Sequence, residues 1–341
     1  MIGAASLPLL LVTGLVTCAL VGCAGGAAPA RRSSSAEEPE APAPSTAAAL
    51  SARPVRRTVH VDGQPLALWE KRPAAPRGSI LFVHGRSWSS LPNFDLRVDG
   101  GDRSVMNAFV RAGYAAYALD MRGYGASPRD ATGWLTPTRA ADDVAAALDF
   151  VRALDPAHAA PVLVGYSRGS SVAMLAAQRH PASLAKLVLY GFPAEGARPA
   201  PPVAEPAAPA RAPNTAANAA SDFVTPGSVP QRVVDAYVEQ ALASDPIHAD
   251  WRREDEFVFD PASVRAPTLV LYGAGDPRAA SPDVATFFSK LGAEDRAWIV
   301  LPRSDHAAHV EDAQPRWVRA ILDFVDPKAP RAASAGPGPA P

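Results

Sequence analysis

The chain has 341 residues, of which 48% are hydrophobic and 20% are charged, so it can bury a large core. Its formal net charge of -1 provides no basic field for nucleic acid. The two cysteines, Cys18 and Cys23, both lie near the N-terminus, which excludes a disulfide framework for a folded domain. No Cys/His cluster has zinc-site spacing, and we expect neither a metal nor a cofactor.

An apolar stretch from Leu7 to Val21 suits a signal peptide better than a membrane span. No Lys or Arg precedes it, unlike the usual positive n-region, and an uncleaved signal anchor is the alternative. The stretch LVGC at 20–23 resembles the lipobox of bacterial lipoproteins. This resemblance implies that residues 1–22 are removed and that Cys23 is lipidated. The protein would then be exported and anchored at the periplasmic or outer-membrane face; a secreted or soluble periplasmic protein is the alternative.

Two segments have neither a helical nor a strand period. Residues 23–54 are rich in Ala, Pro, Ser and Glu, and are predicted to be a flexible tether. Residues 328–341 form a similar disordered tail. The folded domain is therefore predicted to span residues 55–327.

Strand and helix patterns alternate along this domain. Residues 55–61 and 66–72 alternate like an antiparallel pair, and short apolar runs ended by Gly or Asp are typical of buried parallel strands. The helical periods place one apolar stripe on each helix. The sequence predicts an α/β fold with a mostly parallel sheet and helices on both faces. The strand runs are SILFVHG, YAAYALD, PVLVGYS, LAKLVLYG, PTLVLYGAGD and RAWIVLP, and the helical stripes are Val144/Leu148/Val151 and Trp317/Ile321/Phe324.

Residues 193–262 break this rhythm between two core strands. Their first part is rich in Pro and Ala, and their second part has a helical pattern, VPQRVVDAYVEQALA. The aromatic residues Trp251, Phe257 and Phe259 follow. We interpret this segment as a lid insertion within the domain and not as a separate domain.

A serine stands between two glycines in GYSRG at 165–169, which fits G-x-S-x-G. A predicted strand precedes this motif and a helical pattern follows it, as required to expose a serine hydroxyl on a sharp turn. A serine hydroxyl needs a base to activate it, and the base needs an orienting acid. Asp276 and His306 each follow a predicted strand, at the sheet edge where sites form in parallel sheets.

Five short motifs, in order, resemble the α/β-hydrolase family from about residue 55 to residue 326. They are FVHGRSW, LDMRGYGAS, VGYSRGSS, LYGAGD and SDHAAH. The resemblance implies that Ser167 is the nucleophile, Asp276 the acid and His306 the base. It implies that Arg168 and Arg86 supply backbone N–H groups to an oxyanion hole, with Ser87 as the alternative to Arg86.

Other residues near these motifs have competing interpretations. His309 is the alternative base and Asp283 the alternative acid. His84, Asp120 and Arg122 are expected to brace loops and not to act in the chemistry. Trp88 is expected to line the substrate pocket, with packing under the lid as the alternative. The side chains of Arg86 and Arg168 either bind an acidic acyl chain or phosphate, or point to solvent.

The sequence therefore predicts a serine hydrolase that cleaves an ester-type acyl bond of a small substrate through an acyl-enzyme. Dehalogenases and epoxide hydrolases of the same superfamily carry aspartate where this chain has Ser167. An acyltransferase or a haloperoxidase-like enzyme on the same triad is one alternative. A non-catalytic binding lipoprotein is the other.

Overall fold

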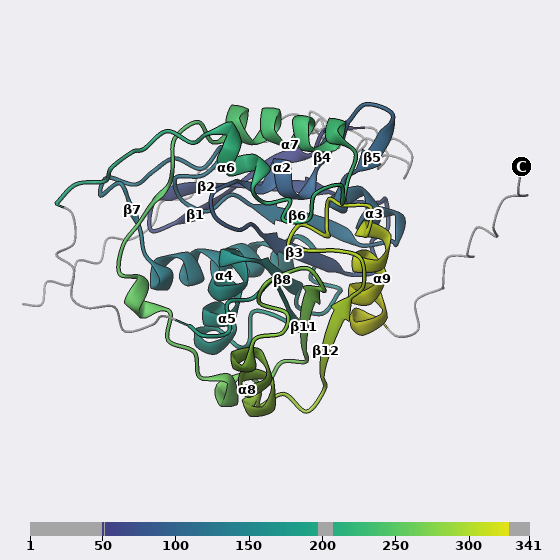
Figure 1. Cartoon of the computed structure of the whole chain (residues 1–341). Coiled ribbons are helices and arrows are strands. Elements are labelled where there is room, and N and C mark those ends of the chain that lie inside the picture. Colours follow the sequence, from purple (N-terminus) through teal and green to yellow (C-terminus); the bar gives the residue numbers. More distant parts are fainter. Residues whose placement is uncertain (1–49, 51, 197–206, 327–341) are drawn as a thin grey trace, which may run out of the picture. The chain divides into compact units, whose positions relative to one another are not determined.

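A computed structural model of the chain describes residues 50, 52–196 and 207–326 (Figure 1). The predicted signal peptide, Cys23, most of the predicted tether and the predicted tail lie outside these ranges. Among the described helices, none is long and apolar enough to cross a lipid bilayer.

Eight strands form the central sheet in the order β1-β2-β6-β3-β8-β9-β11-β12. Strand β2 runs against both of its neighbours, β1 and β6, and every other neighbouring pair is parallel. The predicted α/β fold with a mostly parallel sheet is confirmed. The strands are β1 (Val55–Val61), β2 (Gln64–Lys71), β3 (Ser79–Val83), β6 (Ala115–Leu119), β8 (Val162–Tyr166), β9 (Lys186–Tyr190), β11 (Thr268–Gly273) and β12 (Arg296–Leu301).

The burial of each strand explains its sequence pattern. Every residue of β3, β6, β8 and β11 is buried, because helices cover both faces of the sheet there. Strands β1 and β12 lie at the two edges and are mostly exposed or half-buried. The continuous apolar runs therefore mark the centre of the sheet, where the carboxyl ends of the strands carry the predicted site.

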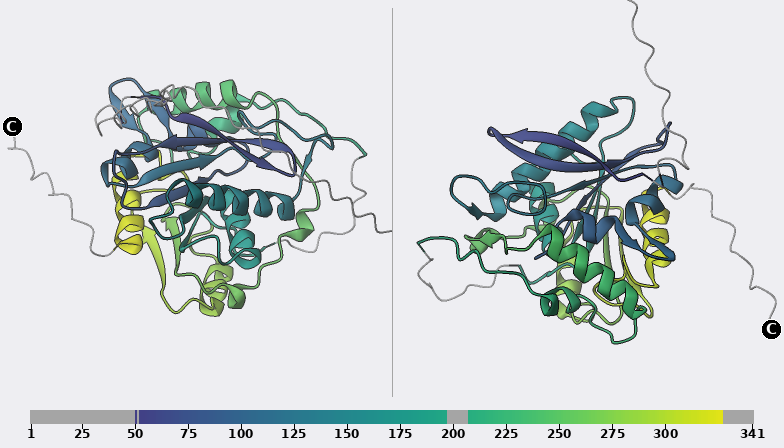
Figure 2. Two further views of the ribbon diagram at one scale, coloured as in Figure 1. Left: turned by 180° about the vertical axis from the view of Figure 1, so that it is seen from behind. Right: turned by 90° about the horizontal axis from the view of Figure 1, so that it is seen from above.

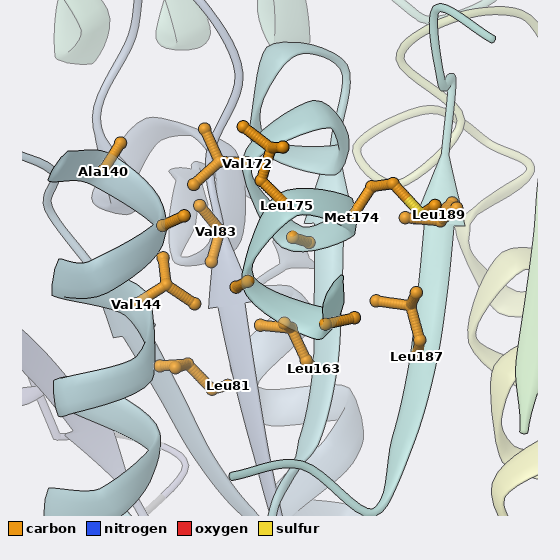
Figure 3. Close-up of a cluster of buried hydrophobic side chains, with 14 of the residues drawn as sticks. Leu81, Val83, Ala140, Val144, Leu163, Val172, Met174, Leu175, Leu187 and Leu189 are labelled. Carbon is orange, nitrogen blue, oxygen red and sulfur yellow. The ribbon is translucent and has the colours of Figure 1, made fainter. Parts of the chain in front are cut away.

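Two groups of helices cover the sheet, one on each face (Figure 2). Helices α4, α5 and α8 pack on one face, and α3 and α9 pack on the other. Figure 3 shows part of the first of these two interfaces, where side chains of α4 and α5 pack against those of β3, β8 and β9. The helices are α2 (Ser90–Phe94), α3 (Val105–Arg111), α4 (Pro137–Leu154), α5 (Arg168–Arg179), α6 (Ala216–Ala220), α7 (Gln231–Ser244), α8 (Pro282–Lys290) and α9 (Gln314–Val325).

The apolar stripes predicted on α4 and α9 pack toward the sheet. On α4, Val144, Leu148 and Val151 are buried, and the Thr136 side chain caps the helix by accepting from the Arg139 N–H. On α9, Trp317 and Ile321 are fully buried. Both stripes face the sheet, so they fix the two layers that hold the strands in place.

Residues 193–262, which we call the insertion, lie between β9 and β11. Its described part contains α6, α7, the short strand β10 (Asp250–Trp251), and the 3-10 turns η1 (Glu254–Glu256) and η2 (Pro261–Ser263). Helix α7 packs on α2 and on the strand β4 (Leu96–Val98). Strand β4 pairs with β5 (Gly101–Arg103), and β10 pairs with β7 (Trp134–Leu135). The sequence pattern missed these ribbons because strands of two or three residues carry no periodicity.

Candidate active site

Ser167 alone makes the turn from β8, which ends at Tyr166, into α5, which begins at Arg168. Its backbone has φ 51° and ψ -121°, a left-handed conformation that is uncommon outside glycine. The Ser167 N–H donates to the Tyr190 carbonyl at 2.8 Å, which ties the turn to β9. The strained turn projects the residue at the carboxyl edge of the sheet, as the motif predicts.

Three glycines allow the chain to pack closely around this turn. A Cβ on Gly169 would lie 2.3 Å from the carbonyl oxygens of Val83 and His84. One on Gly165 would lie 2.5 Å from the Ser170 Cα, and one on Gly85 would lie 3.0 Å from the Ser167 Cβ. The loop after β3 therefore lies directly against Ser167.

Replacing Gly169 with alanine is expected to lower the free energy of unfolding by about 3 kcal/mol, because the new methyl group would overlap two backbone oxygens that cannot move aside. Chemical denaturation measures this change. Gly101→Ala is the matched control, since no atom lies within 4 Å of the position of its Cβ, and it should change stability by less than about 0.5 kcal/mol. Equal stability of the two variants would contradict the packing argument.

Asp276 and His306 meet at the carboxyl ends of β11 and β12. The His306 Nδ1 lies 2.7 Å from the Asp276 Oδ2, and both residues are buried. Burial alone would raise the pKa of Asp276, but His306 and the Arg278 backbone N–H lower it below its usual value. The carboxylate is therefore ionised at neutral pH and places the imidazole proton on Nδ1, which leaves Nε2 as an acceptor.

The His306 ring packs against the turn that carries Ser167. Its centroid lies 5.1 Å from that of Tyr166, the residue directly before Ser167. Gly191, at φ 59°, is needed here because a Cβ would lie 2.7 Å from the His306 Cε1. Within the described residues, no hydrogen bond joins the Ser167 hydroxyl to His306. The structure thus brings the predicted acid and base together beside the predicted nucleophile.

The alternative base and the alternative acid have different surroundings. His309 lies among the rings of Tyr166, Phe94 and Trp317, and neither of its ring nitrogens has a hydrogen-bond partner among the described residues. Burial lowers the pKa of His309 to about 3, with a further contribution from His306. Asp283 is exposed in the first turn of α8. Neither residue contacts the Asp276–His306 pair through a hydrogen bond.

His84 holds the loop after β3 through two hydrogen bonds of its ring. The His84 Nδ1–H donates to the Gly85 carbonyl at 2.8 Å, and its Nε2 accepts from the Met121 N–H at 3.1 Å. Burial lowers the pKa of His84, so the ring is neutral. Asp120 accepts from the Ser90 N–H at 2.9 Å, which fixes the end of the same loop.

Asp120 and Arg122 bind neighbouring elements. A second Asp120 oxygen accepts from the Trp69 Nε1–H at 2.9 Å and from the Ala126 N–H at 3.0 Å. Arg122 makes a two-point ion pair with the buried Asp143 of α4, at 2.6 and 2.7 Å. These contacts join β2, α4 and the loop after β6, and they leave neither side chain free for chemistry.

Two backbone donors lie at the turn. The N–H groups of Arg168 and Arg86 have no hydrogen-bond partner among the described residues. The Arg168 N–H is at the start of α5, where the helix dipole favours negative charge. Ser87, the alternative to Arg86, places its hydroxyl 3.2 Å from the His248 Nε2. The absence of a partner within the described residues is compatible with the predicted oxyanion-hole role of these N–H groups.

The family model described as serine aminopeptidase, S33 matches residues 74–313, which include Ser167, Asp276 and His306. The chain belongs to this family of α/β-hydrolases. It is therefore a hydrolase by family. No curated protein sequence matches the chain significantly.

Solved structures of other α/β-hydrolases share the fold. A thermophilic esterase from Thermogutta terrifontis is 18% identical with a TM-score of 0.56, over 82% of this chain and all of that one. The CarC serine hydrolase of carbazole degradation is 21% identical, with a TM-score of 0.55, over 80% of this chain and 98% of that one. An E-2-(acetamidomethylene)succinate hydrolase is 18% identical, with a TM-score of 0.56, over 80% and 99%. At these identities the likeness establishes the fold alone.

The side chains of Arg86 and Arg168 converge on one carboxylate of this α/β-hydrolase. Arg168 Nη2 lies 2.8 Å from Glu254 Oε2, and Arg86 Nη1 lies 3.3 Å from Glu254 Oε1. Neither guanidinium therefore points simply to solvent, which was one of the two interpretations of the sequence. The sequence pattern missed Glu254 because it lies in the irregular part of the insertion.

Trp88 packs beneath the insertion. It is 2% exposed and belongs to a hydrophobic cluster with Val233 and Tyr237 of α7 and with Ala307, which follows the predicted base. These contacts favour the packing interpretation of Trp88 over the pocket interpretation.

Asp222 of the insertion is a second carboxyl group that acts electrostatically on His306. It accepts a hydrogen bond from the Tyr237 hydroxyl at 2.9 Å. Burial raises the pKa of Asp222 to about 6, although attraction to His306 and the Tyr237 bond both lower it. No sequence signal singled out this residue, since it lies in a short loop after α6.

The described residues contain no group of three or more His, Cys, Asp or Glu side chains that could hold a metal ion.

Proposed function

We propose that this α/β-hydrolase cleaves an ester-type acyl bond through an acyl-enzyme on Ser167, with His306 as base and Asp276 as the acid that orients it. The observation that carries the proposal is the 2.7 Å contact between His306 Nδ1 and Asp276 Oδ2, at the sheet edge that carries Ser167. The environment of His309 supports this choice of base. A ring with a pKa of about 3 takes up a proton poorly at neutral pH.

The reaction begins when the Ser167 Oγ bonds to the substrate carbonyl carbon and its proton passes to the His306 Nε2. The carbonyl oxygen becomes an oxyanion, which the N–H groups of Arg168 and Arg86 stabilise. The bond to the leaving alcohol then breaks, and the alcohol departs with the proton from His306. Water attacks the acyl-enzyme with His306 again as base, the Ser167–acyl bond breaks, and the proton returns to the serine.

One alternative function uses the same triad, and a second is non-catalytic. An acyltransferase or haloperoxidase-like enzyme would pass the acyl group to an acceptor other than water. A non-catalytic binding lipoprotein would not need the Asp276–His306 pair beside the turn serine. Hydrolysis is favoured because the family to which the chain belongs is one of hydrolases.

A fluorophosphonate probe tests the proposal. We expect it to label Ser167 alone, as read by mass spectrometry, because the proposed base and acid activate that hydroxyl. If Ser167 remains unlabelled in folded protein, the hydrolase proposal is wrong. A series of p-nitrophenyl esters of increasing chain length then measures the acyl pocket. Labelling without ester turnover would instead favour amides, thioesters or acyl transfer.

We also propose, from the sequence of residues 1–23, that the enzyme is exported and lipidated at Cys23. The Ala- and Pro-rich residues that follow would let the catalytic domain stand away from a membrane surface. The substrate would then be a small acyl compound outside the cytoplasm.

A further inference from the structure

Arg86, Glu254 and Arg168 form an ion-pair cluster in which each oxygen of one carboxylate contacts a different guanidinium, at 3.3 and 2.8 Å. Two arginines that converge in this way bind a carboxylate through both of its oxygens. The cluster is open to solvent, since the Arg86 and Glu254 side chains are 40% and 41% exposed. A small ligand can therefore reach it.

Both arginines adjoin the proposed nucleophile. Arg168 directly follows Ser167, and Arg86 follows Gly85, whose Cβ position is 3.0 Å from the Ser167 Cβ. The Arg168 guanidinium lies over the rings of Phe257 and Trp251, with its carbon 5.0 and 6.0 Å from their centroids. These two ring contacts do not involve Glu254, so they remain available to the guanidinium when another carboxylate replaces it.

The arginine pair requires an anion. Burial lowers the pKa of Arg168, Arg86 lowers it further by repulsion, and Glu254 offsets part of both effects. Without a carboxylate between them, the two positive charges would repel each other beside a partly buried surface.

Glu254 is not needed to build the turn that carries it. In η1, Asp255 pairs with Arg253 at 3.1 Å, and Glu256 accepts from the Thr138 N–H of α4 at 3.1 Å. These neighbours anchor the turn, whereas among the described residues the Glu254 side chain pairs only with the two arginines. Because ion pairs at such exposure are weak, another carboxylate can compete for the arginines.

We propose that Arg86 and Arg168 form a subsite for a carboxylate at the far end of the substrate's acyl chain, and that Glu254 is an internal ligand displaced by this carboxylate. The substrate class is a half-ester of a dicarboxylic acid. This inference rests on the proposed function, since it assigns a role to the arginines beside Ser167. The insertion then selects the substrate as well as covering the site.

Monomethyl and dimethyl glutarate test the subsite, because they differ in the distal carboxylate. Methanol release measures kcat/KM for each ester. The ratio of kcat/KM for the monomethyl ester to that for the dimethyl ester should rise roughly tenfold in Glu254→Gln, because this variant lacks the competing charge. The same ratio should fall at least tenfold in Arg86→Gln and in Arg168→Lys, because each variant loses one contact with the distal carboxylate. Arg152→Gln, in the exposed pair with Asp149 on α4, is the charge-matched control and should leave the ratio unchanged.

If kcat/KM rises equally for both esters in Glu254→Gln, then Glu254 only holds the insertion in place. This result would overturn the subsite. Calorimetry with glutarate as the probe separates this result from failure of the proposed function, because binding needs no turnover. Glu254→Gln should bind glutarate about tenfold more tightly than the unmodified chain, and Arg86→Gln more weakly. If no ester is hydrolysed but this order holds, the subsite stands and the esterase proposal fails. If glutarate binding does not depend on these residues, the subsite is wrong.

Discussion

Replacing Ser167 with alanine is expected to reduce ester turnover by roughly 10⁴- to 10⁶-fold, because the variant has no atom that can form the acyl-enzyme. The removed hydroxyl has no hydrogen bond to His306 among the described residues, so the fold should be retained. Initial rates with p-nitrophenyl esters measure the loss, and thermal denaturation measures the stability.

The matched control is Ser289→Ala, which removes one exposed hydroxyl from α8 on the surface. Its turnover should equal that of the unmodified chain. A Ser167→Ala enzyme that kept a tenth or more of its activity would show that the reaction does not pass through this serine.

Replacing His306 with alanine is expected to reduce turnover about as strongly as the serine change, because His306 supplies both the base and the acid of the reaction. His309→Phe should retain turnover within about threefold. Its ring already packs among aromatic rings, and its pKa of about 3 keeps it neutral, so phenylalanine preserves what it contributes.

The two histidine variants form their own control, since they lie three residues apart on the same loop. Turnover at pH 7 to 8 decides between them. Loss of activity in His309→Phe together with an active His306→Ala would reverse the assignment of the base.

Much of the fold could be predicted from the sequence because the central strands are buried on both faces. Continuous apolar runs such as those in β3, β8 and β11 then stand out, as do the helical stripes of α4 and α9. The short ribbons β4–β5 and β7–β10 could not be found in this way. Strands of two or three residues show no periodicity, and β7 also pairs with a strand of the distant insertion.

The predicted site residues followed from motifs that keep local geometry. Ser167, Asp276 and His306 each follow a strand, β8, β11 and β12 in turn. Because these strands are parallel, their carboxyl ends lie at the same edge of the sheet. Glu254 and Asp222 escaped prediction because nothing local marks them. Each approaches the site only when the insertion packs over the carboxyl edge.

The sequence by itself determined the α/β fold, the strand–turn–helix around Ser167 and the chain order of the proposed serine, acid and base. The fold depends on local periodicity, and the turn depends on glycines where two segments pack closely. The order of the site residues depends on which strands they follow. Only the tertiary structure decided that His306, and not His309, meets Asp276, and that Trp88 is buried beneath α7. It also decided that Arg86 and Arg168 share Glu254. The physical reason is that these contacts join segments that are distant in the sequence, or depend on which of two neighbouring residues is buried away from a partner. Neither is encoded in a local pattern.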